Sequence, residues 1–130
     1  MKQVKHVVLY GVSCAMSVSH ELLDFLLDQL APLGNVSARR MFGSMGVFLD
    51  GRMFGILSRE NRFYIKTDAN NLEKFVEQGC EPFSYWVSQP SGERKQKRLS
   101  YYEVPDSALE DQDELMFWAR LGVSASMPSG

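Results

Sequence analysis

The densest group of side chains that could act on a ligand is a basic run in the last third of the chain. Its members are Arg94, Lys95, Lys97 and Arg98. Such cations can neutralise phosphates, and the nearby rings of Trp86, Tyr101 and Tyr102 could stack on bases. We expect the run at the tip of a hairpin, where it predicts contact with nucleic acid. A solvated loop that protects an edge hairpin from aggregation would explain the same residues.

A second candidate is the adjacent pair Arg39 and Arg40, which is followed by Phe42. Neighbouring residues on a strand point to opposite faces of the sheet, so at most one of the two arginines can lie over each face. We expect these three residues to form a site that binds a protein. The alternative to a binding site is that one arginine forms a structural ion pair and the other is a solvated charge.

Residues suited to catalysis or metal binding do not form a recognisable pattern. His6 and His20 lack a second ligand at metal spacing, and Cys14 and Cys80 form no C-x-x-C pair. The sequence also lacks the Gly-x-Ser-x-Gly motif of serine hydrolases. We therefore expect no catalytic residues, no cofactor and no metal, and we expect both cysteines to be small buried side chains in a reducing compartment.

The glycines that follow the arginine pair do not make a phosphate loop. Gly43, Gly46 and Gly51 are not followed by Lys-Ser/Thr or by the start of a helix. We expect them to serve turns, where glycine adopts backbone angles that other residues avoid. Asp50-Gly51 in particular lies between apolar runs and predicts a hairpin.

The elements that position these residues follow from hydrophobic periodicity. Apolar residues at helical spacing predict helices that begin after Ser17 or Ser19, after Asp68, and at Asp106 or Ser107. Alternating and β-branched segments predict strands over 36–41, 45–49, 52–57, 63–66 and 83–87, with a last strand near 102–104 and a polar loop over 88–96. The pattern predicts an α+β fold, in which helices cover one face of an antiparallel sheet.

Size and charge narrow the function classes. The chain has 130 residues, 45% of them hydrophobic, with 14 Lys and Arg against 16 Asp and Glu. This composition is typical of one globular domain, and a net charge of −2 does not by itself favour a polyanion. No apolar run reaches the ~20 residues of a membrane span. We expect residues 1–15 to be an N-terminal extension, 16–123 the domain and 124–130 a flexible tail.

Taken together, several segments resemble the TfoX N-terminal domain family of competence regulators, also called the Sxy family. The resemblance covers about residues 16–123, and the order of the segments is more specific than any one of them. The segments are Val36–Gly43, Gly46–Phe54, Phe63–Asp68, Glu81–Tyr85, Leu99–Pro105 and Trp118–Arg120.

The resemblance implies an α-β-β-β-α-β-β-α fold of the secretion-chaperone-like type, as in the YgaC/TfoX-N group. It also implies a cytoplasmic bacterial protein linked to DNA-uptake competence, whose full-length members act with the cyclic-AMP receptor protein on transcription. Full-length members carry a further C-terminal helical domain, so we expect only the N-terminal domain here. The family offers no catalytic residues to carry over.

Three functions remain open at this point. The leading hypothesis is a non-catalytic regulatory module that binds a protein partner, with a homodimer as a further option. The second is a nucleic-acid-binding module that uses the basic residues 94–98. The third is a small-ligand binder or enzyme with a site between helix and sheet.

Overall fold

The computed structural model describes residues 18–41 and 43–128 as an α+β fold, which confirms the predicted class. Its α-helices are α2 (His20–Leu30), α3 (Leu72–Glu77) and α4 (Gln112–Ser126). Its strands are β1 (Val36–Met41), β2 (Ser44–Leu49), β3 (Arg52–Leu57), β4 (Phe63–Lys66), β5 (Pro82–Ser88) and β6 (Arg94–Glu103). The described residues also form two short 3₁₀ helices, η2 (Ala31–Leu33) and η3 (Asp106–Glu110).

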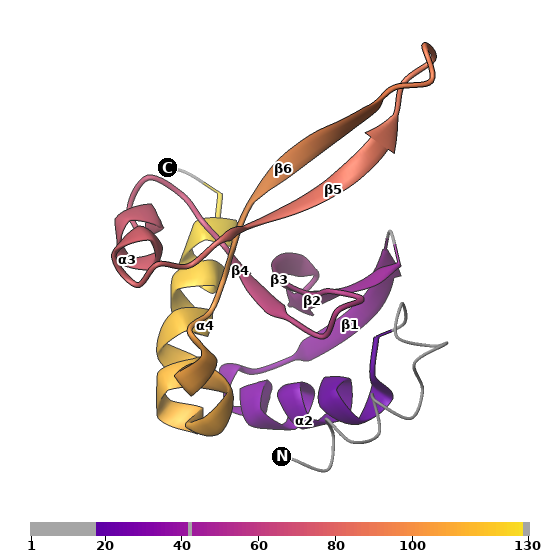
Figure 1. Ribbon diagram of the computed structural model, residues 1–130. Helices are drawn as coiled ribbons and strands as arrows, with labels where there is room; N and C mark the ends of the chain where they lie inside the picture. Colours follow the sequence, from indigo (N-terminus) through magenta and orange to yellow (C-terminus); the bar gives the residue numbers. More distant parts are fainter. Residues whose placement is uncertain (1–17, 42, 129–130) are drawn as a thin grey trace.

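All six strands form one antiparallel sheet in the order β1-β2-β3-β4-β6-β5. Four strands, one more than the family order implies, separate α2 from α3. The hairpin of β5 and β6 joins the sheet through β6 and then extends away from the body of the molecule (Figure 1). Within residues 18–41 and 43–128, the terminal strands of the sheet are therefore β1 and β5.

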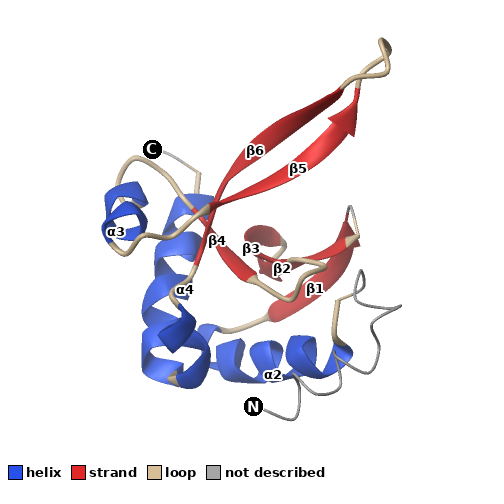
Figure 2. Ribbon diagram, in the orientation of Figure 1, coloured by secondary structure: helices blue, strands red, loops and turns tan. Residues whose placement is uncertain are grey.

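The main core lies between the sheet and the helices α2 and α4, which pack against one another (Figure 2). Helix α2 begins at the predicted cap, where the Ser19 hydroxyl accepts a hydrogen bond from the Leu22 N–H at 3.2 Å. Leu26 and Leu30 are fully buried on its inner face. Helix α4 packs on β3 and β4 and contributes Leu115, Trp118 and Ala119 to the same core.

The predicted turn at Asp50-Gly51 is confirmed. Both residues have positive φ, 52° for Asp50 and 82° for Gly51, as a type I′ turn requires. The turn joins β2 to β3, and a β-bulge between Val47 and Phe48 shifts the register of the two strands. Val47 and its partner Ala38 belong to the main core, so Phe48 and its partner Ser37 lie on the sheet face away from the helices.

Some predicted boundaries were wrong. Helix α3 begins at Leu72 with Asn71 as its cap, because the Asp68 side chain instead accepts hydrogen bonds from the N–H groups of Asn70 and Asn71 in a preceding turn. The last helix is two elements, since Asp111 has extended backbone angles between η3 and α4. Helix α4 also continues to Ser126, so the segment expected as a tail from Ser124 begins in helix.

The predicted loop over 88–96 is shorter in the structure. Strand β5 continues to Ser88 and β6 begins at Arg94, which leaves a turn closed by a 2.7 Å hydrogen bond from the Gln89 N–H to the Glu93 carbonyl. The basic run therefore lies along a strand and not in a loop. The predictions for residues 1–15, including Cys14 and His6, lie outside the described residues.

Candidate interaction surfaces

Arg39 and Arg40 lie on the terminal strand β1, and both are exposed. Arg39 is opposite Gly46 and Arg40 is opposite Met45, so the two side chains leave on different faces of the sheet. Neither forms an ion pair with another described residue, so the structural ion pair considered from the sequence is not present there. The third member of the predicted site, Phe42, lies outside the described residues.

The Arg39 side chain lies over an aromatic ring. Its guanidinium carbon is 4.6 Å from the centroid of the Phe48 ring, within the range of a cation–π interaction. Phe48 is 8% exposed, so the ring is held in place while the Arg39 charge remains in contact with water. This arrangement presents a positioned cation at the edge of the sheet.

A second apolar cluster occupies the sheet face away from the helices. Ile56 belongs to it, whereas the next residue, Leu57, lies in the main core, so the alternation of the strand separates the two clusters. We call this the outer cluster. Its buried members are Ile56, Phe83 and Tyr101, and Met53, Tyr64, Tyr85 and Leu99 pack against them.

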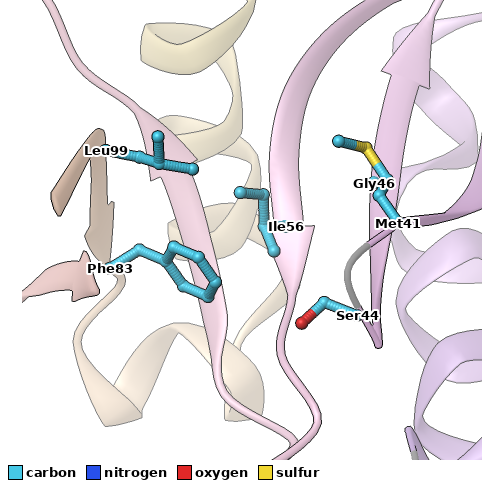
Figure 3. Close-up of a pocket in the computed structure, with 6 residues that line it drawn as sticks. All are labelled: Met41, Ser44, Gly46, Ile56, Phe83 and Leu99. Atoms are coloured by element: carbon cyan, nitrogen blue, oxygen red, sulfur yellow. The ribbon is translucent and has the colours of Figure 1, made fainter. Parts of the chain in front are cut away.

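The outer face has a small hollow lined by residues from both halves of the sheet (Figure 3). Its lining residues are Met41, Ser44, Gly46, Ile56, Phe83 and Leu99. Since β1 and β6 both contribute, the sheet is curved around this point. The cavity volume is about 10 Å³, which is close to the space that one water molecule needs. The hollow is therefore too small for a metabolite.

Gly46 makes room for this packing and does not serve a turn, which corrects its predicted role. It lies inside β2, and a Cβ atom there would be 2.7 Å from Met53 Sδ and 2.8 Å from Met41 Sδ. Gly43 and Gly51 do have positive φ, as residues in turns.

The outer cluster was not predicted from the sequence, because its members come from four different strands that only the folded chain brings together.

The basic run lies on the two-stranded part of the β5–β6 hairpin, which we call the arm (residues 84–100). Here β6 pairs only with β5, since its pairing with β4 is confined to residues 101–103. Residues 94–98 are all exposed. The Arg94 guanidinium carbon is 5.2 Å from the centroid of the Trp86 ring, and Trp86 is 55% exposed. The structure thus brings one predicted stacking ring to the basic run.

The other two rings predicted beside the basic run lie below the arm. Tyr101 is buried in the outer cluster, where Lys66 Nζ is 5.3 Å from its ring centroid. Tyr102 packs against the main core, with its ring centroid 6.1 Å from that of Phe75. Neither ring presents the open face that stacking on a base would require.

The perturbed titratable groups do not resemble an activated nucleophile or acid–base pair. Burial, followed by the nearby Glu103, raises the pKa of the Cys80 thiol and of the Tyr64 hydroxyl. A raised pKa disfavours the reactive thiolate. Among the described residues, no three His, Cys, Asp or Glu side chains are placed to hold a metal ion. None of the described helices has the length and apolar character that a membrane crossing needs.

These features are surfaces on an α+β domain, and the comparisons with known proteins agree with the resemblance read from the residues. The sequence matches the family model of the TfoX N-terminal domain over residues 28–126. The chain therefore belongs to the TfoX N-terminal domain family, and this membership supports a TfoX-like regulatory domain. The sequence matched none of the curated proteins with which it was compared.

Proposed function

We propose that this chain is a non-catalytic, cytoplasmic regulatory module that binds a protein partner through β1 and the adjoining outer face. Membership of the TfoX N-terminal domain family supports a regulatory role. The proposed location of the binding site rests on one observation. Arg39 lies over the Phe48 ring at 4.6 Å, beside an exposed Arg40 on a terminal strand.

A terminal strand offers unpaired backbone groups to which a partner strand can add. Arg39 and Arg40 would then lie on either side of the added strand, because they leave on opposite faces of the sheet. Guanidinium groups form paired hydrogen bonds with carboxylates, so a partner segment rich in Asp and Glu fits this edge. Phe42 remains part of the proposed site on sequence grounds.

The test is site-specific photo-crosslinking in the native cell. A photoreactive residue at Ser37, on β1 opposite Phe48, should yield a defined protein adduct, whereas the same residue at Glu73 on α3 should not. The Arg39→Ala/Arg40→Ala variant should lose the adduct. The matched variant Lys74→Ala/Arg120→Ala, which removes two exposed charges elsewhere, should keep it. An adduct that survives both double substitutions would contradict the proposed edge.

The family resemblance implies DNA-uptake competence and its transcription as the regulated process, and we propose the same process for this chain. If that role applies here, transcripts of competence genes should change when the chain is deleted. Re-expression of the wild-type chain should restore them, and Arg39→Ala/Arg40→Ala should not. The alternative of a small-ligand site between helix and sheet gains no support from the hollow, which lies on the face away from the helices.

A further inference from the structure

We infer that the arm is a second binding site, independent of the β1 edge, which inserts into the major groove of duplex DNA and contacts the phosphates on either side. The argument starts from charge. Residues 84–100 contain four cations and one carboxylate, a net charge of +3. The whole chain carries −2, so the remainder carries −5. The fold thus concentrates positive charge on one projecting element of an acidic protein.

The separation in space allows this charge to act on its own. Seven residues of β6, from Arg94 to Ser100, extend beyond the pairing with β4, a length of about 23 Å at ~3.3 Å per residue. Arg94 is seven residues, or about 23 Å of strand, from Tyr101 at the base. That distance is about two Debye lengths at 0.1 M salt, so the charge at the outer end of the arm is largely screened from the acidic body. Arg98 is nearer to the body, because its neighbour Leu99 packs against the outer cluster.

The basic side chains are also available. None of the four forms an ion pair with another described residue, and all are exposed. Glu93, the one carboxylate of the arm, lies in the turn and not among the cations on β6. A structural role in ion pairing therefore does not account for four cations within five residues.

The register distributes these charges over both faces of the ribbon. Arg94 and Arg98 are opposite Ser88 and Ser84, on the face that also carries Trp86. On the other face, Lys95 and Lys97 are opposite Val87 and Tyr85. Each face thus presents two cations. The exposed Trp86 lies beside one pair, whereas Tyr85, beside the other pair, also packs against the outer cluster.

This two-faced arrangement distinguishes the major groove from a flat anionic surface. The major groove is ~12 Å wide and admits a two-stranded β-ribbon. A ribbon that enters on its edge would turn one face toward each phosphate backbone. A flat surface would contact only one face. The arm projects from the body as a two-stranded ribbon, away from the helices (Figure 1).

The experiment measures binding of the full chain to a fluorescein-labelled 20-base-pair DNA duplex across a salt series. Four phosphate contacts predict a slope of log K against log salt of about −3.6. Arg94→Gln/Arg98→Gln and Lys95→Gln/Lys97→Gln should each reduce that slope by about 1.8. The matched control, Lys74→Gln/Arg120→Gln, makes the same change in total charge on the body and should leave the slope unchanged.

A duplex RNA of the same sequence tests the groove. Its major groove is deep and narrow, so binding should be at least tenfold weaker than to DNA. Equal affinity for the two duplexes, an effect of only one arm pair, or an equal effect of the control pair would each overturn groove insertion. Arm-dependent dimerisation without DNA binding would also overturn it and would assign the arm to the acidic body of a second copy. The substituted side chains are exposed, and an unchanged unfolding midpoint verifies that each variant is folded.

The outcome of the DNA-binding experiment is independent of the crosslinking test of the β1 edge, since the arm variants leave Arg39 and Arg40 intact. Loss of DNA binding with retention of the protein adduct at Ser37 would support two independent sites. Failure of DNA binding would leave the proposed protein-binding edge untouched.

Discussion

The Asn71 side chain donates a hydrogen bond from Nδ2 to the backbone carbonyl of Leu121 at 3.2 Å, and so links the start of α3 to the last part of α4. The same Nδ2 donates to the Lys66 carbonyl at the end of β4, and the Asn71 Oδ1 accepts from the Asp68 N–H. Asn71 is only 3% exposed. Three segments of the chain therefore meet at one buried amide.

Asn71→Ala should destabilise the domain by about 1–3 kcal/mol, because it leaves buried backbone groups without partners. The measurement is the free energy of unfolding in urea. Asn70→Ala is the matched control, since Asn70 is exposed, and it should change the stability by less than about 0.5 kcal/mol. Equal effects of the two substitutions would show that the Asn71 amide does not connect the segments.

Gly122→Ala should destabilise the domain by about 1–3 kcal/mol, although alanine normally favours a helix over glycine. A Cβ at position 122 would be 2.6 Å from Ile65 Cγ2 and 2.8 Å from the Phe54 carbonyl oxygen, so α4 could not keep its place on the sheet. Thermal unfolding would measure the change. In contrast, Gly79→Ala meets no neighbouring atom, and any cost there comes only from its φ of 74°. A Gly122→Ala variant as stable as the wild type would contradict the close contact.

Stability should fall as the pH rises from about 10 toward 12, in part because of Tyr101. Burial raises the pKa of its hydroxyl from 10.0 to about 12, so the folded protein holds this proton more tightly than the unfolded chain does. Its contribution to stability is full below pH 10 and is lost as the pH approaches 12.

Tyr101→Phe isolates this effect. The difference in pH slope between wild type and variant should be at most about 1.4 kcal/mol per pH unit, measured by urea unfolding between pH 9 and 12. Tyr64 also has a raised pKa and remains in the variant, so a smaller slope should persist. Identical slopes in the two proteins would show that Tyr101 ionises equally well when folded.

Truncation to alanine should cost much more stability at one tryptophan than at the other. Trp118→Ala should cost about 3–5 kcal/mol, because Trp118 is 5% exposed and its ring centroid is 4.7 Å from that of Phe75 in the main core. Trp86→Ala should change the stability by less than about 0.5 kcal/mol, since Trp86 lies on the exposed arm. A large loss of stability in Trp86→Ala would mean that the Trp86 side chain itself packs against the body in solution.

Local signals in the sequence determined much of the fold. Asp50-Gly51 predicts its hairpin because two adjacent residues with positive φ are needed there and few residue pairs supply them. The spacing of Leu23, Leu26 and Leu30 predicts α2 because only a helix places all three on one buried face. Strands β1, β3 and β4 have the predicted bounds because they too are marked by local patterns of residues.

Only the tertiary structure decided where the distant segments meet. Neither the pairing of β6 with β4 nor the outer cluster around Ile56, Phe83 and Tyr101 has a local signal, because both depend on contacts between residues far apart in the chain. The outer part of the arm, residues 88–96, was predicted as a loop, since exposed strands with polar side chains on both faces lack the apolar alternation by which a half-buried strand is recognised. The sequence therefore determined how many charges the chain carries, whereas the tertiary structure decided which of them lie apart from the acidic body.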